Sequence, residues 1–174
     1  MNTSKSASFR KLLEMKKPII AVGAHNAISA ILAEQAGFDV IWSSSFEIAA
    51  AFGIPDANIL TMSENLYVAK MINDKVSLPV IADCDNGYGN VINVIRVVEE
   101  YEKIGIAGIC IEDNTFPKRH SFWPGIKRTL ESTEEFAGKI KAAKETQRSR
   151  AFVVIARTEA FIAELGLDEA LARA

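Results

Sequence analysis

The stretch Val80–Glu112, VIADCDNGYGNVINVIRVVEEYEKIGIAGICIE, decides the predicted fold. Short apolar runs stand at its two ends, Val80–Asp83 and Gly108–Glu112, and such runs are typical of strands buried on both faces. Between them, Asn90–Ile104 repeats apolar residues every three or four positions, which is the spacing of an amphipathic helix. The stretch therefore predicts a strand, a crossover helix and a second strand parallel to the first.

The same alternation continues on both sides of this unit. The further predicted strands are Ile19–Ala24, Val40–Ser44 and Phe152–Arg157. The further predicted helices are Ser8–Lys17, expected to cover the bottom of the sheet, Ala27–Ala36, Ser63–Asp74 with Ser63 as its N-cap, Thr133–Thr146, and one beginning at Leu167. Helix ends are predicted at Gly37, Gly105 and Gly166. This rhythm predicts an α/β fold with a parallel sheet, either doubly wound or a (β/α)8 barrel.

The composition is that of an ordinary globular domain and excludes several other classes of protein. Of the 174 residues, 49% are hydrophobic, and 20 Lys+Arg against 22 Asp+Glu give a formal net charge of −2. The apolar fraction argues against disorder, and the slightly negative charge argues against a nucleic-acid partner bound through its phosphates. The apolar runs are too short to cross a membrane, and the N-terminus lacks the apolar core of a signal peptide.

The two cysteines and the lack of internal boundaries indicate the compartment and the domain organisation of the protein. Cys84 and Cys110 lie within apolar runs, so we expect no disulfide and a reducing compartment. No linker, low-complexity tract or block of charge divides the chain. We therefore expect a single-domain, cytoplasmic protein with neither a nucleic-acid nor a membrane partner.

Acidic side chains are predicted to meet at the carboxyl ends of the strands, the edge that we call the mouth. Asp83 ends the third predicted strand and Asp85 follows it, Glu112 ends the fourth, Arg157 ends the fifth, and Asp56 lies in the loop after the second. Ligands of parallel α/β folds bind at this edge. A lone D-x-D is more often a turn or a helix cap, but acids at neighbouring strand ends repel one another unless a cation lies among them. We therefore expect a hard divalent ion, usually Mg²⁺, with Arg157 facing an anion that shares the site.

The loop Asn114–Gly125 follows an acidic strand end and lacks apolar periodicity. Loops of this length in compact α/β domains tend to be functional lids or disordered. Lys118 and Arg119 could close over an anionic substrate and exclude water, or they could be the cations of a solvated loop. The role of His120 is open in the same way.

Residues at the first two strand ends are further candidates for the mouth. We expect His25 to orient the mouth by hydrogen bonding, and Trp42 to form core or pocket wall, where its indole N–H needs a partner. Ser44 and Ser45 end a strand, so backbone N–H groups there could hold an oxyanion. Serines in this place more often cap the next helix.

Three strings of the sequence resemble those of the isocitrate lyase and phosphoenolpyruvate mutase superfamily. They are DCDNGYGN at Asp83–Asn90, EDNTFPK at Glu112–Lys118 and IARTEA at Ile155–Ala160. The similarity runs from about Ala21 to the last residue and is greatest with the phosphoenolpyruvate mutase and phosphonopyruvate hydrolase branch. It implies a (β/α)8 barrel, of which residues 1–174 form a single N-terminal portion with about the first five of the eight β/α units.

The resemblance also implies Mg²⁺ and an α-keto acid or enol bound at the mouth. Asp83 would be the direct metal ligand, and Asp85 and Glu112 would act largely through metal-bound water. The substrate carboxylate would be held by the segment that contains Trp42, Ser44, Ser45 and Phe46. The catalytic candidates are Arg157 for the phosphoryl or phosphonyl group, Lys118 in the gating loop, Asp56 beside the transferring phosphorus, and His120 in the position after Lys118-Arg119.

Departures from the family's pattern bear on the reaction. The lyases carry Cys where this chain has His120, which argues against carbon–carbon lyase chemistry, while mutases commonly have Asn and hydrolases Thr at that position. Ser45 stands where relatives usually have Gly. The segments Phe46-Glu47 and Pro55–Leu60 resemble those of the hydrolases more closely.

The sequence thus predicts a Mg²⁺-dependent enzyme that interconverts phosphoenolpyruvate and phosphonopyruvate. Hydrolysis of phosphonopyruvate to pyruvate and phosphate is the alternative, and a truncated paralogue that only binds a ligand or a partner is a third. The expected partner is a small phosphonate or enol-phosphate substrate, and the resemblance implies a homo-oligomer for the full-length protein.

Overall fold

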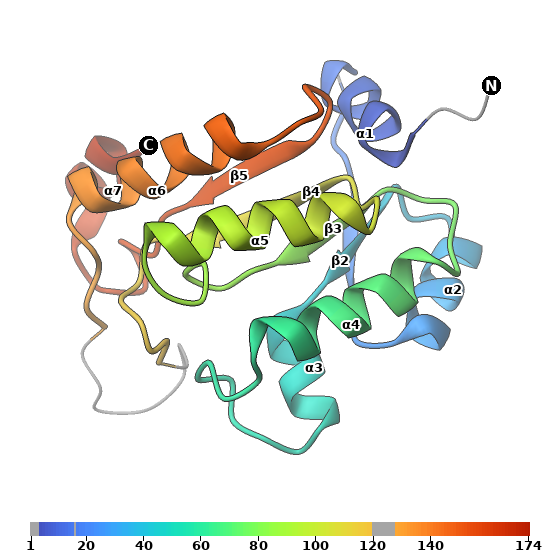
Figure 1. Cartoon of the computed structure of the whole chain (residues 1–174), viewed down its shortest axis with the longest axis horizontal. Helices are drawn as coiled ribbons and strands as arrows, with labels where there is room; N and C mark the ends of the chain where they lie inside the picture. Colours follow the sequence, from blue (N-terminus) through green and yellow to red (C-terminus); the bar gives the residue numbers. More distant parts are fainter. Residues whose placement is uncertain (1–3, 16, 120–127) are drawn as a thin grey trace.

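The computed structural model describes residues 4–15, 17–119 and 128–174, which contain one parallel sheet (Figure 1). Its strands are β1 (Ala21–Ala24), β2 (Val40–Ser43), β3 (Val80–Asp83), β4 (Gly108–Glu112) and β5 (Val153–Arg157). The helices are α1 (Lys5–Glu14), α2 (Ala27–Gln35), α3 (Ser45–Ala51), α4 (Met62–Asn73), α5 (Val91–Lys103), α6 (Thr133–Thr146) and α7 (Gly166–Arg173). The α/β class and all five predicted strands are confirmed.

The order of the strands distinguishes the two architectures that the sequence left open. Each strand pairs in parallel with its neighbour in the chain, in the order β1-β2-β3-β4-β5. A doubly wound sheet would reverse this order at a switch point. An unbroken order with helical crossovers is that of successive β/α units in a barrel. The described strands therefore favour the barrel.

The larger hydrophobic core lies between the sheet and its crossover helices. Helices α4, α5 and α6 lie side by side in front of the strands (Figure 1). Fully buried members of this core include Ile72, Val98, Tyr101, Ile109 and Phe152. Burying a side chain of this size contributes roughly 1.5–3 kcal/mol, so this core holds the strands in register.

Helix α1 covers the amino ends of the strands and forms a second, smaller core. Phe9 packs there against Val40, Ile81 and Val153. The Arg10 guanidinium also donates, at 3.3 Å, to the carbonyl oxygens of the two residues that precede β5. The prediction that the first helix covers the bottom of the sheet is confirmed, although α1 begins and ends earlier in the chain than predicted.

Two helix boundaries differ from the sequence prediction for local reasons. Helix α4 is capped by Thr61 rather than Ser63, because Thr61 and Glu64 form a reciprocal capping box. Gly166 opens α7, with a φ of +82°, and does not end a helix. Positive φ angles at the ends of α2 and α5 confirm the predicted helix ends at Gly37 and Gly105.

Strand pairing brings the predicted site residues to one edge of the sheet. Glu112 of β4 pairs with Arg157 of β5, and Asp83 ends the neighbouring strand β3. Side chains alternate between the two faces of a strand, so Asp83 and Arg157 lie on the same face as Ile81 and Ile155 of the smaller core. The fold therefore aligns these polar side chains at the mouth.

None of the helices in the described ranges has the length and apolarity needed to cross a bilayer. Cys84 and Cys110 are both buried and unbridged. Burial raises the pKa of the Cys84 thiol well above its usual range. Both cysteines therefore belong to the packed interior.

Gly108→Ala tests the close approach of β4 and β5. A methyl group at Gly108 would lie 2.3 Å from the carbonyl oxygen of Val153. We expect the free energy of unfolding, measured by urea denaturation, to fall by about 1–3 kcal/mol. Gly138→Ala is the matched control, because a methyl there meets nothing within 4 Å in α6 and should add about 0.5–1 kcal/mol. Equal unfolding midpoints for the two variants would contradict this packing argument.

Candidate active site

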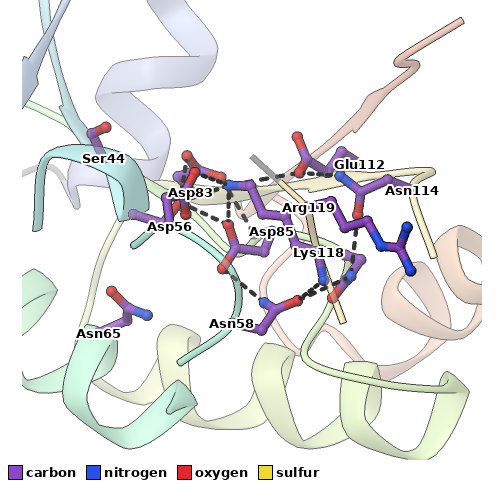
Figure 2. Close-up of polar contacts among 12 residues, drawn as sticks. Ser44, Asp56, Asn58, Asn65, Asp83, Asp85, Glu112, Asn114, Lys118 and Arg119 are labelled. Atoms are coloured by element: carbon purple, nitrogen blue, oxygen red, sulfur yellow. Dashed lines mark hydrogen bonds and ion pairs between the residues drawn. The ribbon is translucent and has the colours of Figure 1, made fainter. Parts of the chain in front are cut away.

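Four acidic side chains and one lysine gather at the mouth (Figure 2). Asp83 and Glu112 end β3 and β4, Asp85 and Lys118 lie in the loops after these strands, and Asp56 lies between α3 and α4 rather than directly after β2. The Lys118 ammonium nitrogen lies 2.6 Å from Asp85 Oδ1, 2.9 Å from Asp56 Oδ2 and 3.8 Å from Glu112 Oε1. Asp83 stands beside Asp85, and all five side chains are buried. The structure thus brings the predicted acids together and places the predicted loop lysine among them.

Ser45 connects two of these acids. Its hydroxyl oxygen lies 2.9 Å from Asp83 Oδ2 and 2.7 Å from Asp85 Oδ1. Because a hydroxyl carries one proton, Ser45 donates to one carboxylate at a time. The backbone N–H of Asp85 also donates to Asp83 Oδ1 at 3.3 Å. The serine hydroxyl therefore adds a contact to the acidic pair that a glycine at this position could not make.

The loop after β3 owes its shape to a sharp turn and to support from α6. Asp85 and Gly87 both have left-handed backbone angles, with φ of +49° and +83°. Such an angle strains a residue other than glycine, so neighbouring contacts must hold Asp85 in place. Buried Lys139 of α6 donates to the Asn86 carbonyl oxygen at 2.9 Å and lies 2.6 Å from Glu131 Oε1. Lys139 therefore supports this loop from the helix side.

Three asparagine amides join the acids into one hydrogen-bonded network. Asn58 Nδ2 donates to Asp85 Oδ2 at 3.1 Å, and Asn114 Nδ2 donates to Glu112 Oε1 at 2.6 Å. Asn86 Nδ2 lies between them, 3.2 Å from Asn58 Oδ1 and 3.1 Å from Asn114 Oδ1. These uncharged amides were not predicted as site residues, because only charges mark the mouth in the sequence, although each lies within two residues of a predicted site acid.

A second ion-pair group adjoins Glu112. Arg157 Nε lies 3.4 Å from Glu112 Oε2, and Arg157 Nη2 lies 2.5 Å from Glu159 Oε1. Arg128 Nη1 pairs with the other oxygen of Glu159. Arg157 is a predicted site residue. No role was predicted for Glu159, which lies in the IARTEA string, or for Arg128, which no motif marks.

The predicted substrate-binding segment lies at the start of α3. The Ser44 hydroxyl accepts a hydrogen bond from the Glu47 backbone N–H at 3.2 Å, so Ser44 is the N-cap of α3. Figure 2 shows Ser44 apart from the dashed network around Lys118. Trp42 is half-buried beside the smaller core, and Phe46 is exposed. The capping alternative is thus confirmed for Ser44, and the substrate contacts of this segment stay predictions.

The remaining candidates are the histidines and the second cation of the long loop. Lys118 is buried at the mouth, whereas the neighbouring Arg119 is exposed and matches the solvated-loop alternative. His25 Nδ1 lies 3.7 Å from a carboxylate oxygen of Glu47. His120 lies outside the described residues.

Burial and neighbouring charges shift the pKa values of Asp85 and Lys118. Burial raises the pKa of Asp85 to about 7; Lys118 opposes this rise, and Asp83 adds to it. Burial acts to lower the pKa of Lys118, but Asp85, Glu112 and the other acids outweigh burial and raise it. Lys118 therefore carries a positive charge at neutral pH, in a group that holds more acids than bases.

The chemistry of the donors fits Mg²⁺, although their arrangement is not a ready-made coordination shell. Asp83, Asp85 and Glu112 offer carboxylate oxygens, which hard cations prefer. Within the described ranges, however, no three His, Cys, Asp or Glu side chains are grouped so that they could hold a metal ion. The Lys118 ammonium lies against two of the three predicted ligands. A divalent cation bound by these acids would therefore lie beside the Lys118 ammonium or take its place.

Comparison with known proteins gives consistent matches. The family model for phosphoenolpyruvate phosphomutase matches residues 9–174. Phosphonopyruvate hydrolase of Variovorax sp. (strain Pal2) is 48% identical over 98% of this chain and 59% of its own length. Phosphoenolpyruvate phosphomutase of Tetrahymena pyriformis is 41% identical (99% and 58% covered), and 2,3-dimethylmalate lyase of Eubacterium barkeri is 43% identical (99% and 58%). This chain thus spans less than two thirds of the length of these relatives.

Solved structures match the fold closely. Phosphoenolpyruvate phosphomutase from Streptomyces platensis subsp. rosaceus has a TM-score of 0.94 and 53% identity, covering 97% of this chain and 58% of that one. Phosphonopyruvate hydrolase in complex with oxalate and Mg²⁺ has a TM-score of 0.90 and 47% identity, covering 98% and 58%. These likenesses confirm the predicted barrel fold for the β/α units present.

Lys118→Met tests whether the ammonium holds the acids together. Removing one partner of a buried ion pair leaves an uncompensated charge, so without divalent cations we expect the free energy of unfolding to fall by about 3–5 kcal/mol. Mg²⁺ should raise the melting temperature of this variant more than that of the wild type. Lys139→Met, which removes another buried lysine paired with an acid, is the matched control and should gain no more from Mg²⁺ than the wild type. An equal response in both variants would count against a cation site among these acids.

Proposed function

The chain belongs to the phosphoenolpyruvate phosphomutase family, and from that membership we propose that the full-length protein is a Mg²⁺-dependent enzyme that interconverts phosphoenolpyruvate and phosphonopyruvate. The observation that carries the proposal is the meeting of Asp83, Asp85, Glu112 and Lys118 at the mouth, with Arg157 beside Glu112. Several acids, an ammonium and a guanidinium suit a small substrate that carries both a carboxylate and a phosphorus-bearing dianion.

In the proposed reaction, a phosphoryl group moves between carbon and oxygen of one molecule. The carbon–phosphorus bond of phosphonopyruvate breaks, and a bond from phosphorus to the enol oxygen forms, so no atom or electron is gained or lost. When bound, Mg²⁺ supplies Lewis-acid stabilisation of the substrate's negative oxygens. Asp83 would hold the ion directly, and Asp85 and Glu112 would hold it through intervening waters.

The side chains of this chain provide positioning and charge. Arg157 binds the phosphoryl oxygens, for which its planar guanidinium is well shaped. Lys118, protonated and buried, supplies a second positive charge as negative charge moves with the phosphorus. Asp56, 2.9 Å from Lys118, lies beside the transferring phosphorus in this proposal. Phosphoryl transfer depends mainly on such positioning and charge stabilisation.

Phosphonopyruvate hydrolysis is the second candidate function. It is favoured by the hydrolase-like segments Phe46-Glu47 and Pro55–Leu60 and by the 48% identity to phosphonopyruvate hydrolase. The two reactions differ in the acceptor of the phosphoryl group, which is the enol oxygen in the mutase and water in the hydrolase. A carbon–carbon lyase is disfavoured by His120 in place of cysteine, and a non-catalytic paralogue is the remaining alternative.

We also propose the setting in which the full-length protein works. Its ligand is a small phosphonate or enol phosphate, without a nucleic-acid or membrane partner, and its assembly is a homo-oligomer. Its location is the cytoplasm, which the unbridged and buried Cys84 and Cys110 support.

Phosphorus NMR of the full-length protein with phosphonopyruvate and Mg²⁺ tests the proposed reaction. We expect the phosphonate signal to be replaced by that of phosphoenolpyruvate, because the mutase moves phosphorus within one molecule. Free phosphate with an equal amount of pyruvate would establish the hydrolase instead. Turnover to neither product, with Mg²⁺ present and the protein folded, would exclude both.

Asp83→Asn tests the role of the direct metal ligand. Changes in the outer shell of a metal site typically cost 10–100-fold in affinity or activity, so loss of a direct ligand should cost about 100-fold or more in Mg²⁺-dependent turnover. Asp39→Asn is the matched control, because Asp39 accepts a hydrogen bond from the Ile20 N–H at the opposite end of the sheet. Activity retained in the Asp83 variant would show that its assignment is wrong.

A further inference from the structure

The orientation of the Arg157 side chain depends on its contacts with neighbouring side chains. Its side chain is 39% exposed, and a long side chain in that state loses rotamer freedom only when other groups hold it. Arg157 Nη2 lies 2.5 Å from Glu159 Oε1, whereas Arg157 Nε lies 3.4 Å from Glu112 Oε2. The shorter contact to Glu159 therefore sets where the guanidinium points.

Glu159 is itself held firmly. It is 1% exposed, and its backbone N–H donates to Asp113 Oδ1 at 2.8 Å. The neighbouring Thr158 hydroxyl donates to the other oxygen of Asp113 at 2.9 Å. Asp113 is fully buried and pairs with Arg173 of α7 at 3.2 Å. Because its backbone is pinned in this way, Glu159 acts as the fixed point and Arg157 adapts to it.

Arg128 meets the same carboxylate through its other oxygen. Arg128 Nη1 pairs with Glu159 Oε2, while Arg157 uses Oε1. Arg128 is 8% exposed, and its Nη2 donates to the backbone carbonyl oxygen of Arg119. Glu159 is therefore shared by two guanidiniums that come from different parts of the chain.

The charges of these three groups decide what the arrangement does. A buried carboxylate paired with Arg157 alone would form a pair without net charge. With Arg128 included, the trio carries a formal charge of +1, which faces the further carboxylate of Glu112 at 3.4 Å from Arg157 Nε. Charges that are partly shielded from water act over several ångströms. Arg128 therefore keeps Glu159 from adding to the negative charge that Glu112 already places beside Arg157, which leaves more of the positive charge of Arg157 for a substrate anion.

We propose that Glu159 and Arg128 are positioning residues of the anion site. Glu159 orients the Arg157 guanidinium, and Arg128 offsets the negative charge of Glu159, so that Glu159 does not cancel the positive charge with which Arg157 binds a phosphate-type dianion. This inference rests on the proposed function, because it takes Arg157 to be the residue that binds the phosphorus-bearing group. It adds two residues that act on the substrate only through Arg157.

Inorganic phosphate, titrated by calorimetry into the full-length protein, probes the charge balance. Arg128→Gln leaves Glu159 to neutralise Arg157, so the Kd for phosphate should rise about tenfold. Combining it with Glu159→Gln restores a formal charge of +1 and should bring Kd back to within about threefold of the wild type. Arg128→Lys keeps the charge, should bind phosphate nearly as the wild type does, and serves if the glutamine variant fails to fold. Arg10→Gln, at the opposite end of β5, is the control and should leave Kd unchanged.

Turnover of phosphonopyruvate distinguishes the effect of the orientation of the Arg157 guanidinium from the effect of its charge. Glu159→Gln adds one unit of net charge, so phosphate should bind at least as tightly as to the wild type. Arg157 loses its charged anchor in this variant, so kcat should fall about tenfold or more. If Glu159 had only a structural role, the Glu159→Gln variant would melt at a different temperature but would not combine tight phosphate binding with a reduced kcat.

An unchanged phosphate Kd in Arg128→Gln, or no recovery in the double variant, would overturn the proposal. So would a folded wild-type protein that binds no phosphate. If the wild type binds phosphate and the variants follow the expected pattern while phosphonopyruvate is not converted, the proposed function fails and the anion site stands.

Discussion

Repulsion among buried carboxylates at the mouth is the constraint on which the rest of the site depends. Asp56, Asp83, Asp85 and Glu112 all lie out of water there, where like charges interact strongly. The chain offsets this repulsion with the ammonium of Lys118 and with hydroxyl and amide donors. These donors come from the start of α3, from the segment between α3 and α4, and from the loop after β4, so one electrostatic need fixes how these segments lie against one another.

The sheet creates this crowding and makes it useful. Parallel strands turn all their carboxyl ends to one edge, and the core behind them keeps each strand in register. The same edge then holds positively and negatively charged side chains within a few ångströms of one another. Arg157 and Lys118, for example, lie 3.4 Å and 3.8 Å from the two oxygens of the Glu112 carboxylate. Binding of a metal ion and of a substrate with several negative groups would change the electrostatic interactions among these side chains. Ligand binding at this edge and the stability of the fold are therefore coupled.

The sequence predicted the strands well because a strand buried on both faces leaves a continuous apolar run, as in Val80–Asp83 and Gly108–Glu112. Helix α3 was not predicted, because its apolar residues follow β2 with no change of period and only a serine marks its start. The acids could be located from their strand ends, but the position of Lys118 depends on how its loop folds back. Arg128 and Glu159 meet only in the tertiary structure, far apart in the chain, so no local pattern announces their pairing.

The first helix of the chain has a consequence for the order in which the molecule assembles. Ser6 of α1 donates to the carbonyl oxygen of Ile106, and Arg10 donates to those of Ala151 and Phe152, across separations of 100, 141 and 142 residues. Closing such long loops is slow compared with forming local helix contacts. During synthesis, α1 leaves the ribosome before the other described helices, yet it lacks its docking surface until the chain has grown past β5. Helix α1 is therefore made before its docking surface and is among the last of the described elements to find its place.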